Sequence, residues 1–365
     1  MPRTILLSPG PVALTEGVKS ALLVDQLGHR EPEFAALTRL VNTQLCGVYD
    51  ETRQDYESVV LTGSGTCAVE AMLATFAPRT SQTLVLANGV YGERSAAMLE
   101  CHGLPHELVA FEWTSGIDSD VVATRLRDST EIGAVFAVHH ETTTGRLNDI
   151  AALGELCRRH GKPLMLDVVS SFGAEEIRPR SWNVSAFAGT AGKCLHGAPG
   201  ISFVVAARAQ WETATRKPSS VYLNLARYRH DQGLSGYSPF TQAVPLLSAL
   251  HEALHELERS GGWAARRQLF RSRGTKIYKA LERAGVVPLV DPAQSSCVLQ
   301  SFRIPSGVSY QALHDQLKAQ GFVIYAGQGR FAPEIFRIAN MGDMAATDID
   351  NLCQRLIEFF RRAES

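Results

Sequence analysis

The sequence predicts an α/β protein in which a large domain with a mainly parallel central sheet precedes a smaller α+β domain. Short β-rich runs alternate with helical patterns through the first two-thirds of the chain, as expected of parallel strands joined by crossover helices. Several runs are apolar throughout, which is typical of strands in a sheet that helices cover on both faces. A long helical pattern near residue 250 then leads into a C-terminal third with its own strands and helices.

The predicted elements of the first part follow one another closely along the chain. Strands are predicted at residues 58–61, 83–87, 107–111, 132–138, 163–169 and 201–206. Helical patterns between these strands cover residues 68–76, 91–102 and 150–160. The stretch 208–238 is less regular and is rich in Tyr, Arg and Gly.

The C-terminal part begins with two long helical patterns. The first covers 244–259 and stops at Gly261 and Gly262, because glycine just past a helix is a common stop signal. Further elements are a helix at 263–284, strands near 296–304 and 322–325, and helices near 310–319 and 346–363. We therefore expect a large domain of residues 1–250 and a small domain of residues 251–365.

Composition and charge exclude several classes of protein. Hydrophobic residues make up 45% of the 365 residues, which excludes a disordered or fibrous chain. The net charge of -1 and the absence of like-charge blocks predict no binding to nucleic acid or to a membrane surface. No apolar run approaches the roughly 20 residues that span a bilayer, and the N-terminal segment is too short in its apolar part for a secretory signal. Seven scattered cysteines without a Cys-x-x-Cys pair indicate a reducing compartment, so we expect a cytoplasmic protein without a metal site.

The first chemical motif is Gly63-Ser64-Gly65-Thr66, which follows a predicted strand and opens a predicted helix. Glycines allow a ligand to approach the backbone, and the free amides at a helix start attract anions. The motif lacks the Gly-Lys-Ser/Thr of a P-loop and the spacing of a dinucleotide fingerprint. Taken alone, it fits a phosphate-binding cup or a plain capped turn.

Two further residues stand out at the ends of apolar strands. Asp167 lies near the C-terminal end of one strand, where ligands gather in open α/β sheets, although it also fits a helix cap. Lys193 lies among small residues with no acid nearby in the sequence, although it also fits an ordinary glycine-rich loop. Pyridoxal phosphate requires a lysine for its aldehyde, an acid for its ring nitrogen and an anion cup for its phosphate. The three motifs together therefore predict a site for this cofactor.

With these motifs in place, the chain resembles the class V, fold-type I aminotransferases, and within them the 2-aminoethylphosphonate–pyruvate transaminases. The resemblance covers nearly the whole chain. The segments that carry it are Ser8-Pro9-Gly10-Pro11, Gly63-Ser64-Gly65-Thr66, Asn88-Gly89-Val90-Tyr91-Gly92, His139-His140-Glu141-Thr142-Thr143-Thr144-Gly145, Asp167 with Ser170-Ser171-Phe172-Gly173, Lys193-Cys194, Gly197-Ala198-Pro199-Gly200, Gly321-Phe322-Val323-Ile324-Tyr325 and Phe336-Arg337-Ile338-Ala339-Asn340-Met341-Gly342. The Glu-Thr-Thr-Thr-Gly and Lys-Cys segments favour the phosphonate branch over the alanine–glyoxylate branch.

The resemblance implies a role for each residue of the pyridoxal phosphate site. Lys193 would bind the cofactor covalently, and Asp167 would pair with its ring nitrogen. Ser64, Gly65 and Thr66 would hold its phosphate group.

For the remaining positions, the resemblance implies the following. Tyr91 would stack on the cofactor ring, and Thr142 or Thr143 would lie near its phenolic oxygen. Thr241 would complete the phosphate cup of the neighbouring subunit, which implies a homodimer with shared active sites. Arg337 would bind the acidic end of the substrate.

One segment, residues 28–34, is closer to the alanine–glyoxylate and serine–pyruvate relatives and to some phosphonate members. This N-terminal segment is implied to shape the substrate end of the site. Arg30 within it fits either a substrate-binding cation or a partner of Glu33 on a helix.

The function implied is transfer of the amino group of 2-aminoethylphosphonate to pyruvate, which gives phosphonoacetaldehyde and alanine. The partners would thus be a small amine and a keto acid. Alternatives of the same class would use another aminophosphonate, or alanine or serine with glyoxylate or pyruvate. A cysteine desulfurase is disfavoured because no convincing mobile loop surrounds Cys297. A catalytically silent anion-binding module is disfavoured because the lysine, the acid and the cup are all intact.

Overall fold

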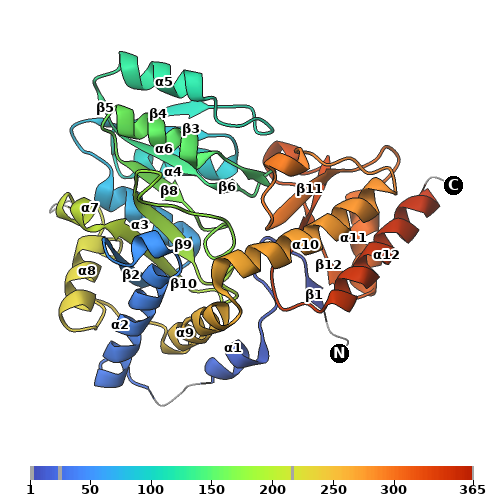
Figure 1. Cartoon of the computed structure of the whole chain (residues 1–365), viewed down its shortest axis with the longest axis horizontal. Helices are drawn as coiled ribbons and strands as arrows, with labels where there is room; N and C mark the ends of the chain where they lie inside the picture. The colour runs from blue at the N-terminus through green and yellow to red at the C-terminus, as the bar shows by residue number, and fades with distance from the viewer. Residues whose placement is uncertain (1–3, 24–26, 215–217, 364–365) are drawn as a thin grey trace.

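The computed structural model describes residues 4–23, 27–214 and 218–363 and is built around a central sheet of seven strands (Figure 1). The strand order is β2-β10-β9-β8-β5-β3-β4. All neighbours are parallel except for β10, which runs antiparallel to both β2 and β9. The strands are β2 (Tyr56–Thr62), β3 (Gln82–Ala87), β4 (His106–Ala110), β5 (Ile132–Val138), β8 (Leu164–Asp167), β9 (Val184–Thr190) and β10 (Ile201–Ala207). The predicted fold, a mainly parallel sheet in an α/β protein, is confirmed.

Helices cover both faces of this sheet and bury its apolar strands. Four helices contribute to the core on one face: α2 (Pro32–Gly47), α5 (Ser119–Asp128), α6 (Ile150–Arg159) and α9 (Val244–Arg259). Four contribute to the core on the other face: α3 (Gly65–Phe76), α4 (Val90–Cys101), α7 (Arg208–Glu212) and α8 (Leu225–Leu234). Strands β5 and β10 are buried almost throughout, which explains why their sequences carry apolar side chains on both faces.

The predicted strands of the sheet agree with the structure to within two residues at each end, but β9 was missed. Its sequence, Val-Ser-Ala-Phe-Ala-Gly-Thr, contains mostly small residues with low strand propensity. Every residue of β9 except Ser185 is buried, and Gly189 lies against the Phe203 ring of β10, where a Cβ would approach that ring to 2.4 Å. Tertiary packing therefore overrides local propensity in the strand that leads to Lys193.

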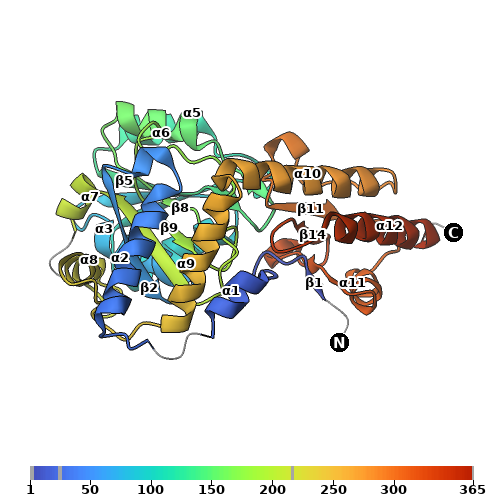
Figure 2. The same cartoon turned by 60° about the horizontal axis from the view of Figure 1, so that its bottom comes forward.

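The C-terminal part forms a separate layer beside the sheet (Figure 2). Helix α10 (Gly262–Glu282) runs from the large sheet toward α12 (Ala346–Ala363), and α11 (Tyr310–Ala319) lies below them. An antiparallel sheet has the order β11-β14-β13, from β11 (Leu299–Arg303), β14 (Ile335–Ala339) and β13 (Tyr325–Ala326).

Two details bear on the expected division at residue 250, which stays a prediction. Residue 250 lies within α9 rather than between elements. Near the N-terminus, β1 (Ile5–Leu6) pairs in parallel with β12 (Phe322–Val323) of the C-terminal part. The chain then passes back toward the central sheet, where Gly10 lies 3.4 Å, measured from the position of a Cβ, from Cγ of Lys193. The N-terminal segment therefore lies between the two parts of the molecule, beside the lysine.

Over the described ranges, no helix combines the length and apolar character needed to cross a membrane. Nor do His, Cys, Asp and Glu side chains gather there in groups of three or more that could bind a metal ion.

Candidate active site

The carboxyl ends of four parallel strands bring the predicted site residues to one edge of the sheet. Strands β3, β5, β8 and β9 run in the same direction, so the segments that follow them meet there. Asp167 is the last residue of β8 and pairs in register with Ala188 of β9. Lys193 follows three residues after the end of β9. The acid and the lysine, 26 positions apart in the sequence, are thus neighbours because their strands are neighbours.

Lys193 is held next to Asp167 by the turn that follows β8. The Lys193 ammonium donates from Nζ to Oγ of Ser170 at 2.9 Å. The carbonyl oxygen of Ser170 lies 2.8 Å from Nδ1 of His140. Burial lowers the pKa of His140 to about 4, so this imidazole is neutral near pH 7 and adds no positive charge beside the lysine. The contact between Ser170 and Lys193 was not predicted, because a serine in a turn carries no signal that links it to a lysine 23 positions later.

Asp167 is a buried carboxyl group, only 7% exposed. Its Oδ1 accepts a hydrogen bond from the Val169 amide at 2.8 Å. Burial raises the pKa of Asp167 to about 6, while this hydrogen bond and the positive charges of Lys193 and Arg94 act in the opposite direction. A cation placed against this carboxyl group would relieve the cost of burying its charge.

The phosphate cup of the sequence prediction is the N-terminus of α3. Ser64 is the N-cap, and its hydroxyl accepts from the Cys67 amide at 3.4 Å. Gly65 and Thr66 are the first two helical residues, whose amides have no partner within a helix. A Cβ on Gly65 would lie 2.7 Å from Cγ1 of Val169, so a larger residue there would collide with the segment that follows Asp167.

Between α3, α4 and the end of β8 lies a narrow slot that joins the cup to the acid. Its lining includes Gly65, Thr66, Tyr91, Asp167 and Val169. Tyr91 is the second residue of α4, and Val169 follows Asp167 by two residues. The structure therefore brings the cup, the aromatic residue and the acid together, as predicted.

Several residues of this slot, among them Val169 and Arg94, were missed by the sequence analysis. Val169 is apolar and half-buried, and nothing in its type distinguishes it from a core residue. Arg94 lies one helical turn after Tyr91, and its guanidinium is 4.9 Å from the centre of the Tyr91 ring. The spacing of three residues on a predicted helix was the available signal that these two side chains share a face.

Hydrogen bonds distinguish the two candidate threonines, Thr142 and Thr143, which follow β6 (His140–Glu141). The Thr143 hydroxyl donates to Oε1 of Glu141 at 2.6 Å and accepts from the Val90 amide at 3.2 Å. The Thr142 hydroxyl is buried and has no hydrogen-bond partner among the described residues. Of the two threonines, Thr142 is thus the one whose hydroxyl remains available for a ligand.

Arg337 reaches this turn from β14 of the C-terminal sheet. It is 5% exposed and donates to the carbonyl oxygens of Ala326 and Thr142, both at 2.8 Å, with a longer contact of 3.4 Å to Gln328. All of these acceptors are neutral. Burial lowers the pKa of Arg337 below its ordinary value, but an arginine keeps its proton near pH 7.

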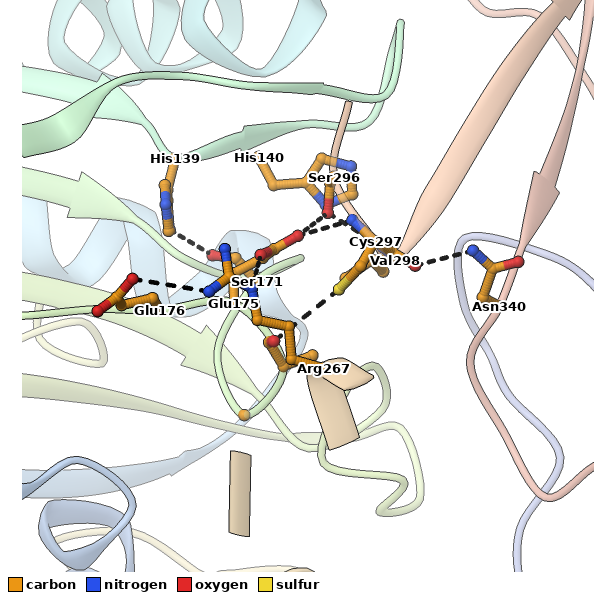
Figure 3. A network of polar contacts seen from close by, with 12 residues as sticks. His139, His140, Ser171, Glu175, Glu176, Arg267, Ser296, Cys297, Val298 and Asn340 are labelled. Atoms are coloured by element: carbon orange, nitrogen blue, oxygen red, sulfur yellow. Dashed lines mark hydrogen bonds and ion pairs between the residues drawn. The ribbon is translucent and has the colours of Figure 1, made fainter. Parts of the chain in front are cut away.

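Figure 3 shows the network that fixes the C-terminal sheet against the central one. The buried carboxylate of Glu175 accepts from Oγ of Ser296 and from the amide of Cys297, both at 2.7 Å, and pairs with Arg267 of α10 at 3.1 Å. Burial alone would raise the pKa of Glu175, but these hydrogen bonds hold it below its ordinary value. The side-chain amide of Asn340 donates to the carbonyl oxygen of Cys297 at 2.8 Å. Asn340 directly follows β14, the strand that carries Arg337.

The same network bears on the alternative that relies on Cys297. Its amide and its carbonyl are both hydrogen-bonded, and its side chain is 8% exposed. Burial raises the pKa of its thiol. A mobile catalytic cysteine would need an accessible thiolate, so the geometry disfavours the desulfurase alternative.

Arg30 contacts the segment that precedes Thr241. Both side chains are exposed, and Arg30 donates from Nη1 to the carbonyl oxygen of Ser238 at 3.1 Å. Thr241 precedes Gln242, whose side chain accepts from the hydroxyl of Thr62 at 2.9 Å. Among the described residues, no hydrogen bond, ion pair or ring contact joins Arg30 to Arg337.

A larger hollow than this slot, of about 880 Å³, lies between α2, α8, α9 and the start of α10. None of the predicted cofactor residues lines it. The start of α3, Tyr91 and Asp167 identify the smaller slot as the candidate site.

Comparisons with known proteins agree with this geometry. The model of the family described as aminotransferase class V matches residues 51–344. The 2-aminoethylphosphonate–pyruvate transaminase of Bacteroides fragilis strain YCH46 is 31% identical over 362 residues, which cover 99% of each chain. The protein of the same name from a Vibrio cholerae serotype O1 strain is 33% identical over 351 residues, or 95% of each chain.

Solved structures of aminotransferases share the fold over nearly the full length. A subgroup IV aspartate aminotransferase from Thermus thermophilus superposes with a TM-score of 0.90 at 27% identity, covering 98% of this chain and 99% of its own. An alanine–glyoxylate aminotransferase from Nostoc sp. gives a TM-score of 0.90 at 26% identity, covering 98% of this chain and 95% of its own. The chain belongs to the class V aminotransferase family.

Proposed function

We propose that the protein is a pyridoxal phosphate-dependent transaminase that moves the amino group of 2-aminoethylphosphonate to pyruvate. The observation that carries the proposal is Arg337, a buried guanidinium with only neutral hydrogen-bond acceptors, beside the segments that hold Lys193 and Asp167. A buried cation that has no carboxylate as a hydrogen-bond partner favours an anionic ligand. Relatives that are 31–34% identical carry the name of this transaminase.

The residues present fit pyridoxal phosphate. The helix start at Gly65 and Thr66 suits a phosphate group, and the Asp167 carboxyl group suits a protonated ring nitrogen. The buried, unpartnered hydroxyl of Thr142 offers a donor for the ring's phenolic oxygen. Tyr91 and Val169, which both line the slot, offer an aromatic and an apolar surface for a flat ring. When bound, the cofactor supplies an aldehyde that takes the amino group and a ring that accepts electrons from the substrate carbon.

Lys193 performs the proton transfers of the reaction. Its Nζ would hold the cofactor through the cofactor's aldehyde. As a free amine, Nζ would take the proton from the substrate carbon that bears the amino group, and in the second half-reaction it would donate a proton to the carbonyl carbon of the keto acid. Ser170, 2.9 Å from Nζ, keeps the amine close to Asp167 throughout.

Arg337 binds the acidic end of each substrate in turn. The phosphonate of the amine and the carboxylate of pyruvate occupy the site in separate half-reactions, so one cation serves both. A guanidinium presents two parallel N–H donors to either anion, which orients the substrate as well as attracting it. Its anchoring by the carbonyls of Ala326 and Thr142 fixes that orientation.

Arg337→Lys should raise the KM for pyruvate by roughly 10–100-fold, the cost of losing a charge-assisted bidentate contact. Lysine keeps the charge but cannot reproduce the paired donors. Steady-state kinetics and a pyridoxal phosphate titration should show that cofactor affinity changes by less than about threefold. Arg303→Lys, on the exposed end of β11, is the matched control. Equal loss of cofactor and keto-acid binding would contradict the assigned role.

The amino donor is tested by a panel of amines with pyruvate as acceptor. We expect alanine formation to be fastest with 2-aminoethylphosphonate, slower with other aminophosphonates, and slow with serine. A second panel with glyoxylate as acceptor and alanine as donor examines the alanine–glyoxylate alternative. Faster turnover in the second panel would assign the protein to that branch instead.

We also propose that the active enzyme is a homodimer. Thr241 and Arg30 are both exposed, and Arg30 contacts Ser238, three residues before Thr241, so this segment is accessible to a second subunit. Sedimentation of the active protein should give about twice the chain mass of 39.7 kDa. A fully active monomer would exclude a role for Thr241 in the site of a neighbouring subunit.

A further inference from the structure

Glu141 is a fully buried carboxylic acid at the edge of the candidate site. Its Oε1 accepts from both the amide of Thr143, at 3.1 Å, and the hydroxyl of Thr143, at 2.6 Å. The Thr143 oxygen in turn accepts from the amide of Val90 at 3.2 Å. Val90 is the first residue of α4, so a continuous chain of hydrogen bonds runs from this carboxyl group to the helix that carries Tyr91.

The start of α4 has no cap of its own. Its N-cap residue is Gly89, which has no side chain to bond the free amides of the first turn. A Cβ on Gly89 would lie 2.3 Å from Cδ of Glu141 and 2.4 Å from its Cγ. The backbone of Gly89 is extended, with φ 169°, so alanine there would be excluded by the carboxyl group and not by the backbone. The Glu141 carboxyl group therefore occupies the space that an N-cap side chain at position 89 would fill.

The charges around Glu141 also favour a carboxyl group at the start of α4. Burial raises the pKa of Glu141 to about 7, while the hydrogen bonds from Thr143 and the nearby amide of Gly92 act in the opposite direction. Gly92 is the third residue of α4, whose amide an N-cap side chain commonly bonds. The partial positive charge of a helix start also favours a carboxylate.

We propose that Glu141 is a positioning residue that caps α4 from a neighbouring strand and thereby fixes the ring of Tyr91 over the cofactor. The inference rests on the proposed function, because the slot beside Tyr91 is taken as the pyridoxal phosphate site. Thr143 is the link between the two elements, and Gly89 is the residue that makes room. Glu141 touches neither substrate nor cofactor in this role.

The test is a titration of the cofactor-free enzyme with pyridoxal phosphate, combined with hydrogen exchange of the segment 88–95. Glu141→Ala should weaken cofactor binding about tenfold, the change expected from losing one helix cap, and should speed exchange in the first turn of α4. Glu141→Gln keeps the acceptor for Thr143 and should stay within about threefold of the wild type. Glu100→Ala, an exposed acid in the last turn of α4, is the control and should change neither measurement.

A second pair of variants tests the steric half of the proposal. Gly89→Ala should weaken cofactor binding about tenfold, because its methyl group displaces the carboxyl group. In the Glu141→Ala background, the same substitution should change binding less than about twofold, because the space is then free. Effects that multiply to about a hundredfold would show that the two sites act independently and would overturn the proposal.

Two further outcomes would refute either the positioning role of Glu141 or the proposed function. Unchanged cofactor affinity and exchange in Glu141→Ala would refute the positioning role, while a wild type that binds no pyridoxal phosphate would refute the proposed function itself. If Glu141→Ala does not fold, Thr143→Val against Thr143→Ser tests the same chain of hydrogen bonds. Valine should then reproduce the loss, and serine, which keeps the hydroxyl, should not.

Discussion

Lys193→Ala should lose the visible absorption of lysine-bound pyridoxal phosphate and should lower kcat by roughly 10²–10⁴-fold, the usual contribution of a positioned acid–base group. Alanine offers neither an amine for the cofactor's aldehyde nor a base for the substrate proton. The structure supports this expectation through the Nζ–Oγ contact of 2.9 Å to Ser170, which holds the amine beside Asp167. Absorption spectra and single-turnover kinetics measure the two effects separately.

The matched control for this variant is Lys279→Ala, an exposed lysine on α10. It should keep both the absorption and the rate. Borohydride reduction of the wild type, followed by peptide mapping, should place the cofactor on Lys193 alone. A label on any other lysine, or full activity of Lys193→Ala, would contradict the assigned chemistry.

Much of the fold was predictable because its strands are apolar and its helices amphipathic. Strand β5 and helices α9, α11 and α12 match the predicted ranges at both ends. The order of strands in the sheet was not predictable, since it depends on contacts between segments far apart in sequence. Strand β9 was missed because buried small residues carry little strand signal.

The site was predictable where a residue type is chemically distinctive and hidden where it is not. Asp167 and Lys193 stood out as single charged groups among apolar or small residues. The choice between Thr142 and Thr143 required coordinates, because only hydrogen bonds separate two adjacent residues of one type. Val169 resembles any core residue in the sequence, and its place in the slot follows from the turn after β8.

Asp167→Asn should lower kcat at least about 10²-fold, because a neutral amide cannot keep the ring nitrogen of the cofactor protonated. The structure supports this role through the burial of the carboxyl group at the base of the slot. Asparagine retains an oxygen that can accept from the Val169 amide, so the local turn should persist. Cofactor binding should weaken as well, since the attraction between the carboxylate and the protonated ring is lost.

The same variant should have the opposite effect on the stability of the cofactor-free protein. Burial raises the pKa of Asp167 from 3.8 to about 6, so the folded chain binds this proton more tightly than the unfolded chain. The stability that this provides is present below pH 3.8 and is lost as the pH rises through 6, because the buried group must then carry a charge. Asp167→Asn removes that cost and should stabilise the cofactor-free protein at pH 8 by up to about 3 kcal/mol.

This advantage of Asp167→Asn should shrink as the pH falls from 6 to 4, because the wild-type carboxyl group is then protonated in the folded protein and increasingly in the unfolded chain as well. Added pyridoxal phosphate should reverse the order at pH 8, because it stabilises the wild type more strongly through the paired carboxylate. Denaturant unfolding at pH 4 and pH 8, with and without cofactor, measures all four cases. Asp149→Asn, at the exposed N-cap of α6, is the matched control and should show no such dependence, because asparagine caps a helix as well as aspartate does. A variant less stable than the wild type at pH 8 without cofactor would mean that Asp167 serves the fold rather than the cofactor.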